Sequence, residues 1–163
     1  MVEAIKPQHP ITYQLLRLLS CMLAGGIISQ TIACLAAYLF ISDSQAAGMV
    51  ANIVVQHLSY YFLGYSFVIL SIGNILIKRG AHSLKNIRLS LLILILTVSA
   101  TSFLLIPRMD YLRETALLDG MPVMLSPFAN YFQVLNILVV LLLLTQIISS
   151  ALVAWRLIAS ELT

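Results

Sequence analysis

The chain has 163 residues, of which 61% are hydrophobic and 9% are charged, and its mean hydropathy is +1.01. A soluble domain is about half apolar and about a quarter charged, so this composition excludes an ordinary water-facing surface. The net charge of +3 does not indicate nucleic-acid binding, because no aromatic and basic residues interleave in a groove-like pattern. We therefore expect an all-α polytopic membrane protein with a single domain over residues 1–163.

Four long uncharged stretches define the expected membrane helices. A helix needs about 20 apolar residues to cross the hydrocarbon core of a bilayer. The first stretch is too long for the apolar part of a cleavable signal peptide. We expect a bundle of four transmembrane helices near residues 14–41, 49–77, 88–106 and 128–155, with a basic loop at 78–88 and an outer-side loop at 107–127.

Small residues recur at every fourth position of the first span. On a helix they form a stripe that lets a second helix backbone approach closely. The pattern predicts a packing interface with a partner helix, either within this chain or in another subunit. The stripe consists of Cys21, Gly25, Ser29, Ala33 and Ala37.

The second and fourth spans carry polar side chains at a similar depth, in the expected outer half of the membrane. Amides in this position form interhelical hydrogen bonds worth about 0.6 to 2 kcal/mol each. We interpret His57 as a polar residue with its hydrogen bonds satisfied, and the alternative is a ligand or a proton relay. The candidate polar pocket consists of Asn52, Gln56, His57, Asn130 and Gln133.

The third apolar run ends at Pro107, and four charged residues follow it within one short segment. Their spacing fits a short amphipathic helix, because residues three or four apart are neighbours on a helix surface. The segment predicts an interfacial cap that ends the third span. The alternative is an outer-side docking or ligand-binding surface formed by Arg108, Asp110, Arg113 and Glu114.

Lysine and arginine are distributed unequally between the two sides of this topology. The loop after the third span contains two arginines, Arg108 and Arg113. The positive-inside rule therefore predicts that both termini are cytoplasmic and that the protein lies in the cell (inner) membrane. The opposite, basic side carries Lys6, Arg17, Lys78, Arg79, Lys85, Arg88 and Arg156.

The motif Ile106-Pro107-Arg108 followed by Leu112-Arg113 resembles a segment after the third helix of an uncharacterised bacterial family. Members of that family are four-helix integral membrane proteins, with small vertebrate relatives. The family often has a histidine near the start of helix four, where this chain reads ANYFQ. The resemblance implies the four-helix topology and no function. Further similar positions are Gly25 and Gly26 in helix one, and Phe128, Tyr131, Phe132 and Asn136 in helix four.

No Asp, Glu, Lys or Arg lies in the middle of any expected span. Ionisable residues inside a membrane usually mark proton relays, ion pathways and redox sites. No nucleophile–base pair, phosphate loop or metal-type spacing is present either, so we expect neither an enzyme nor a cofactor or metal of its own.

These observations favour a non-catalytic subunit, or an assembly and stability factor, of a larger membrane complex, with a respiratory complex as one candidate. Its partners would be other integral membrane proteins and membrane lipids, and not nucleic acid. One alternative is a homo-oligomeric small-molecule carrier or pore that uses the polar pocket. Another is a subunit that contacts a partner's haem or quinone through His57 and nearby tyrosines.

Overall fold

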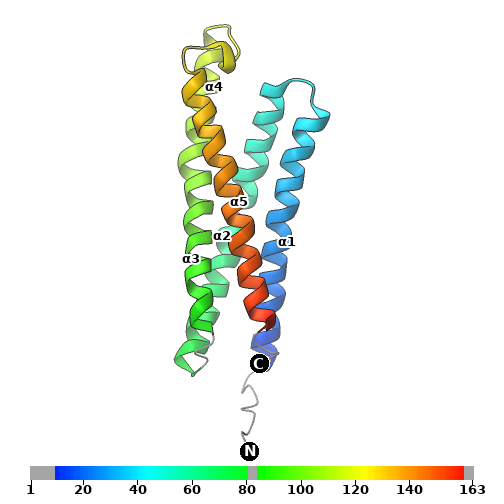
Figure 1. The fold of residues 1–163 in the computed structure, drawn as a ribbon, viewed down its shortest axis with the longest axis vertical. Coiled ribbons are helices and arrows are strands. Elements are labelled where there is room, and N and C mark those ends of the chain that lie inside the picture. Colours follow the sequence, from blue (N-terminus) through cyan, green and yellow to red (C-terminus); the bar gives the residue numbers. More distant parts are fainter. Residues whose placement is uncertain (1–9, 81–83, 160–163) are drawn as a thin grey trace, which may run out of the picture.

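The computed structural model describes residues 10–80 and 84–159, and every regular element in these ranges is helical. Lys6 and residues 81–83 of the expected basic loop lie outside these ranges. The long helices lie side by side in Figure 1. The elements are α1 (Pro10–Phe40), α2 (Ser44–Lys78), α3 (Lys85–Ala100), η2 (Thr101–Leu105), α4 (Ile106–Leu118), η3 (Val123–Leu125) and α5 (Ala129–Ala159).

Four helices are long and apolar enough to cross a membrane, as expected of a multi-pass membrane protein. Many large apolar side chains on these helices face outward, which is the arrangement that lipid contact favours. The first, second and fourth helices overlap the expected spans closely. The third was expected to end near residue 106, but it continues to Leu118 as one helix of 34 residues, Lys85–Leu118.

Pro107 does not end the third helix, and the reason lies in the turn before it. Proline lacks an N–H, and in a regular α-helix its ring collides with the carbonyl four residues earlier. Here the preceding turn, η2, is a π-helix in which the Ile106 N–H donates to the Thr101 carbonyl. The wider turn accommodates the ring. The start of the expected 107–127 loop is therefore helical, as the charge spacing indicated, but α4 continues the third helix instead of ending it.

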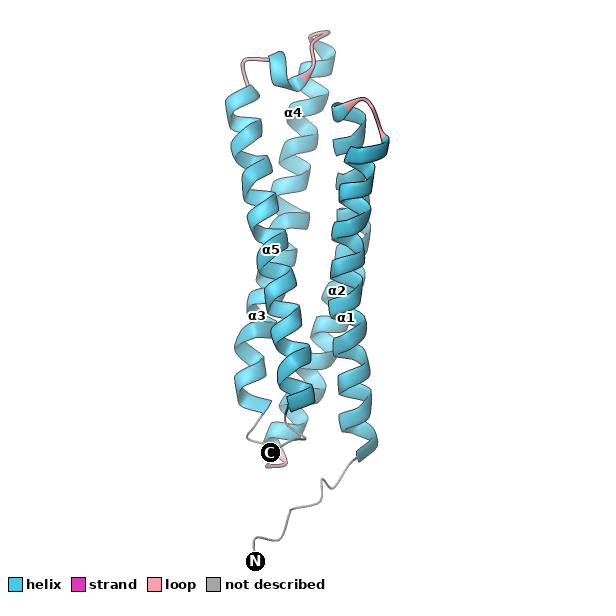
Figure 2. Ribbon diagram, turned by 45° about the vertical axis from the view of Figure 1, so that its right-hand side comes forward, coloured by secondary structure: helices cyan, strands magenta, loops and turns pink. Residues whose placement is uncertain are grey.

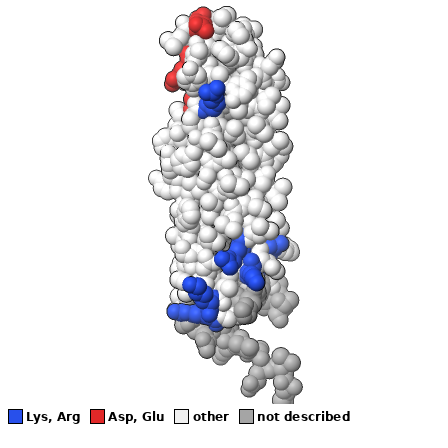
Figure 3. All heavy atoms as spheres, turned by 90° about the vertical axis from the view of Figure 1, so that its left-hand side faces the viewer, with Lys and Arg blue, Asp and Glu red and all other residues white. Residues whose placement is uncertain are grey.

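The charged residues separate to the two ends of the molecule, as Figure 3 shows for one face. We call the end where α1 begins and α5 ends the basic end, and the opposite end the α4 end. At the basic end, Arg17 Nε donates to the Leu157 carbonyl at 3.2 Å. Arg156 donates to the Asn86 carbonyl at the start of α3. Both arginines therefore fix the end of α5 against its neighbours.

The turns between the helices have identifiable caps. Asp43 precedes α2, and its side chain accepts a hydrogen bond from the Gln45 N–H at 2.9 Å. Gly80 and Gly120 follow α2 and α4 with φ values of +102° and +71°. Residues with a Cβ rarely adopt this left-handed conformation, so glycine is favoured at both helix ends. The short turns at the α4 end are visible in Figure 2.

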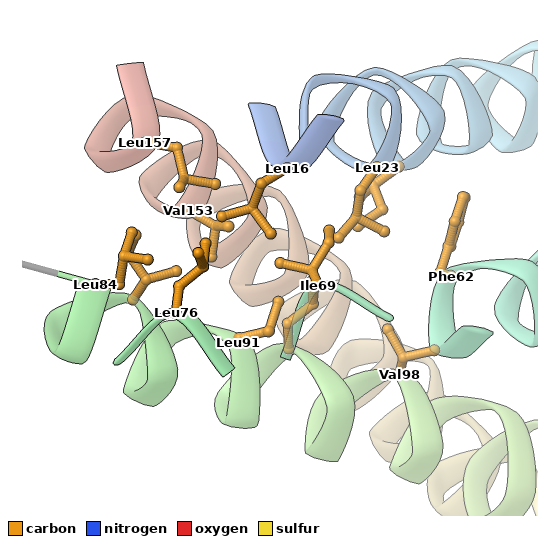
Figure 4. Packing of buried hydrophobic residues seen from close by; sticks show 13 residues of the cluster. Leu16, Leu23, Phe62, Ile69, Leu76, Leu84, Leu91, Val98, Val153 and Leu157 are labelled. Atoms are coloured by element: carbon orange, nitrogen blue, oxygen red, sulfur yellow. The ribbon is translucent and has the colours of Figure 1, made fainter. Parts of the chain in front are cut away.

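One hydrophobic core joins all four long helices in the half of the molecule nearer the basic end. Figure 4 shows side chains from α1, α2, α3 and α5 converging there. Each is almost completely buried, so this core fixes how the helices face one another. Its central members include Leu16, Leu23, Ile69, Leu91 and Val153.

A second hydrophobic cluster lies at the α4 end. Met109, Leu112 and Ala116 of α4 pack with Phe132 and Leu135 of α5. The three α4 residues recur at helical spacing and so lie on one face. The packing of this face against α5 therefore fixes the rotation of α4 about its axis.

Candidate functional site

Arg113 of α4 has a buried guanidinium, and the residue is only 3% exposed. Its Nη1 lies 3.2 Å from Asp110 Oδ1, one helical turn earlier. The same carboxylate oxygen accepts a hydrogen bond from Asn52 Nδ2 at 2.8 Å. Asn52 belongs to α2, so Asp110 links the buried arginine to a second helix.

Gly48 of α2 leaves the space that the Arg113 guanidinium occupies. A Cβ on Gly48 would overlap Arg113 Nη2 and would lie 3.1 Å from the Tyr38 hydroxyl. On the other side, the centroid of the Phe132 ring lies 5.0 Å from Arg113 Cζ, which is a cation–π distance. The guanidinium is therefore enclosed by α1, α2, α4 and α5.

The Arg113 guanidinium carries more N–H donors than its neighbours provide acceptors for. Arginine carries several N–H donors and no acceptor. Among the described residues Asp110 is its hydrogen-bond acceptor, and the Nε–H has no partner. A buried polar group without a partner carries a large desolvation cost. The site therefore favours a further acceptor group.

A groove of about 260 Å³ lies beside this cluster, between α1, α2 and α5. Apolar side chains form most of its lining, and Leu35, Val140 and Leu144 are exposed and open it sideways. Tyr38 and Asn136 line it, and neither the Tyr38 hydroxyl nor the Asn136 amide has a hydrogen-bond partner in the described part of the chain. Asn52 lines it too, so the groove and the arginine cluster share a wall.

The structure does not bring the residues of the expected polar pocket together. Asn52 lines the groove and Gln56 is half-buried, whereas His57, Asn130 and Gln133 are exposed. The His57 Nδ1 lies 2.9 Å from the Ile53 carbonyl of its own helix.

The α5 amide that shares the groove with Asn52 is instead Asn136. Asn136 lies one helical turn after Phe132 and one turn before Val139, which are both buried, so its helix face turns inward. The expected hydrogen bond between Asn52 and an α5 amide is not formed, because Asn52 donates to Asp110 of α4.

The four residues of the expected docking surface are divided between the surface and the interior. Arg108 and Glu114 are exposed, Asp110 is half-buried and Arg113 is buried. The Arg108 guanidinium lies 5.6 Å from the ring centroid of Tyr111. These residues therefore form no continuous surface.

Sequence reasoning missed the inward position of Arg113, although a signal for it exists. Met109, Leu112 and Ala116 are apolar at helical spacing, and Arg113 lies within the same arc. Reading the segment as a continued helix would have placed the arginine on the buried face.

The small-residue stripe of α1 points away from the other helices over most of its length. Cys21, Gly25, Ser29 and Ala33 are exposed, and Ala37 is buried. A Cβ on Gly25 would meet nothing within 4 Å. A different face of α1 packs inside the molecule, through Leu23, Ile27, Gln30 and Cys34.

Two glutamines are buried near the middle of α1 and α5, each 1% exposed. Gln146 Nε2 donates to Thr101 Oγ1 at 3.2 Å. Neither amide atom of Gln30 has a hydrogen-bond partner in the part of the chain that the structure describes. These groups are polar but not ionisable, so they offer hydrogen bonds and no proton-transfer chemistry.

Within residues 10–80 and 84–159, no group of three or more His, Cys, Asp or Glu side chains could hold a metal ion. No family model, no curated protein and no solved structure matches this chain.

Proposed function

We propose that this chain is a non-catalytic membrane subunit, or an assembly and stability factor, that packs against the helices of a larger membrane complex. The outward position of the α1 stripe carries this proposal. Small residues allow close helix packing in membranes, yet the chain buries only Ala37 of its own stripe. The exposed part, Cys21, Gly25, Ser29 and Ala33, fits a helix from another protein.

The short connections between helices support a partner within the membrane. Only Ile41–Asp43 separate α1 from α2, and η3 lies in the short connection between α4 and α5. Within the described residues, these connections offer little surface for soluble partners. Its natural partners are other integral membrane proteins and lipids, and a respiratory complex is one candidate.

We also propose a four-helix bundle in the cell (inner) membrane with both termini cytoplasmic. The basic end carries most of the lysine and arginine in Figure 3, and such residues favour the cytoplasmic side. The α4 end would then face outward. Its two arginines, Arg108 and Arg113, lie in a segment that also contains Asp110, Glu114 and Asp119.

A homo-oligomeric carrier is the second candidate, and the groove beside Asn52 is the observation in its favour. Three of the five residues expected to form its pocket are exposed outside the groove, which weakens it. A subunit that meets a partner's haem or quinone remains a further alternative, because the exposed His57 faces outward.

The proposal is tested by purifying the tagged chain from its native membrane in mild detergent, as wild type, Gly25→Leu and Gly64→Leu. Both glycines are exposed, and a Cβ on either would meet nothing within 4 Å. The two variants therefore add the same side chain to open surface, and only Gly25 belongs to the stripe. A native gel and mass spectrometry would identify the bound proteins.

We expect larger membrane proteins in fixed ratio with the wild type and with Gly64→Leu, and their loss with Gly25→Leu. A wild-type chain that runs alone or as a homo-oligomer would overturn the proposal, as would full retention of the partners by Gly25→Leu. A visible absorbance band that His57→Ala removes would favour the haem alternative instead.

A further inference from the structure

We propose that the groove between α1, α2 and α5 binds one phospholipid from the leaflet at the α4 end. Its phosphate would accept hydrogen bonds from the Tyr38 hydroxyl and the Asn136 amide, and one acyl chain would lie along α5. This inference does not depend on the proposed function, because it uses a different face of the molecule from the α1 stripe.

The polar end of the groove is rich in donors and lies beside a positive charge. Tyr38 and Asn136 line the groove, and neither the Tyr38 hydroxyl nor the Asn136 amide has a partner among the described residues. The Tyr38 hydroxyl and Arg113 Nη2 both lie close to the same point above Gly48. The groove therefore offers two donors to an anionic group with several acceptors, and the buried Arg113 cation lies behind its Tyr38 and Asn52 wall.

One half-exposed carboxylate compensates this cation only in part. Asp110 is 40% exposed, and its Oδ1 is shared between Arg113 and Asn52. The Arg113 Nε–H has no acceptor within residues 10–80 and 84–159. Arg113 does not line the groove, so a phosphodiester held by Tyr38 and Asn136 would place its negative charge near this cation without contacting the buried Nε–H.

The depth of these groups matches the head-group region of a bilayer. At a rise of about 1.5 Å per residue, Asn136 lies about 30 Å along α5 from Arg156, and Tyr38 lies about 30 Å along α1 from Arg17. The hydrocarbon core is also about 30 Å thick. With the arginines at one surface, Tyr38 and Asn136 therefore lie near the other.

The apolar part of the groove lies on the basic-end side of Tyr38 and Asn136, and it is open toward the surrounding lipid. Val140 and Leu144 follow Asn136 at helical spacing, toward the basic end, and both are about half exposed. An acyl chain can enter from the surrounding lipid without passing through water. Moving a chain from lipid into this groove gains little free energy, so the polar end must provide the selectivity.

The test uses the purified, delipidated full chain in detergent, titrated with phosphatidylglycerol and analysed by native mass spectrometry. Val140→Trp fills the groove, and Val134→Trp is its matched control, since Val134 is equally exposed but does not line the groove. Asn136→Leu removes the amide, and Gln133→Leu is its control on the exposed side. Diacylglycerol, which lacks the phosphate, is the control ligand.

We expect one saturable phospholipid adduct on the wild type and on both controls. Val140→Trp should lose it, and Asn136→Leu should bind about threefold to tenfold more weakly, as the loss of one membrane hydrogen bond predicts. Thermal unfolding checks that each variant is folded. If Val140→Trp does not fold, the Asn136→Leu and Gln133→Leu pair carries the test.

Three results would overturn the inference. Equal, unsaturated adducts on all variants would indicate only the general lipid shell. Diacylglycerol binding as tightly as phosphatidylglycerol would remove the role of the phosphate. A quinone that co-purifies in a Val140-dependent way, without phospholipid, would assign the groove to another ligand.

Discussion

The buried guanidinium of Arg113 depends on the glycine opposite it. Gly48 provides the space between α2 and α4, and Asp110, Phe132 and Tyr38 surround the side chain. A guanidinium fixed by an ion pair and an aromatic ring cannot shift freely. A methyl group at Gly48 would therefore force a rearrangement of the cluster.

Gly48→Ala should destabilise the protein by about 1 to 3 kcal/mol, as overpacking usually does. Gly64→Ala is the matched control on the same helix, because its Cβ would meet nothing within 4 Å. Replacing an exposed helical glycine with alanine should leave the free energy of unfolding unchanged or raise it by about 0.5 to 1 kcal/mol. Unfolding temperatures in detergent measure both effects.

The double variant Gly48→Ala with Arg113→Leu separates this explanation from a general effect of the α2 substitution. If the clash with the guanidinium is the cause, the Gly48→Ala cost should largely disappear once Arg113 is replaced. Equal unfolding temperatures for Gly48→Ala and Gly64→Ala would contradict the role given to Gly48.

For single residues, the sequence indicates which helix face a side chain occupies better than which residue of another helix it contacts. Helical spacing is enough to place Arg113 on the face of Met109 and Leu112. The hydrogen bond from Asn52 to Asp110 joins helices that are distant in the chain. It depends on how far each helix is rotated about its axis, and no pattern within one segment determines that rotation.

The π-helical turn η2 is the feature that makes α3 and α4 one element. A π-turn accommodates one residue inserted into an α-helix. The residues after it therefore face the same directions as they would in a regular helix without that residue. Hydropathy and Pro107 together predicted a helix end near residue 106. Neither reports the backbone adjustment that lets a helix continue through a proline.

Deleting Leu104 together with Pro107→Ala should give a folded protein, because the deletion converts η2 into regular α-helix. Deleting Leu92 with the same proline substitution should not give a folded protein. This deletion rotates all later residues of the helix by about 100° about its axis. Arg113 would then turn toward lipid. Leu104 and Leu92 are both exposed, so the lost side chains are comparable.

The yield of monodisperse protein and its unfolding temperature distinguish the two deletions. A Leu92 deletion that folds as well as the Leu104 deletion would show that the register of α4 does not matter. The single Pro107→Ala variant provides the reference for both.

For the whole molecule, the number and order of the membrane helices follow from the apolar stretches of the sequence. Four stretches predicted four helices, and four candidate membrane helices are present in the described residues. The groove could not be predicted, because it depends on α5 packing against α1. The sequence identifies the apolar and polar faces of each helix, and helix–helix packing determines which faces contact one another.

The proposed orientation predicts a specific labelling pattern. In a cysteine-free background with Cys21→Ser and Cys34→Ala, a cysteine is introduced as Met121→Cys at the α4 end or as Lys85→Cys at the basic end. Both positions are exposed. In intact cells an impermeant maleimide should label Met121→Cys only, and permeabilised cells should show labelling of both. Labelling of Lys85→Cys alone would show the opposite orientation.

The order in which the helices contact one another has a consequence for biosynthesis. Neighbouring pairs are α1 with α2, α2 with α3, α3 with α5, and finally α5 with α1. The helix that closes this circuit, α5, leaves the ribosome after the other three. Until it inserts, Arg113 lacks the Phe132 ring and the groove lacks one wall. Before α5 inserts, the nascent chain therefore holds a partly uncovered arginine beside lipid, and the insertion of α5 completes its cover.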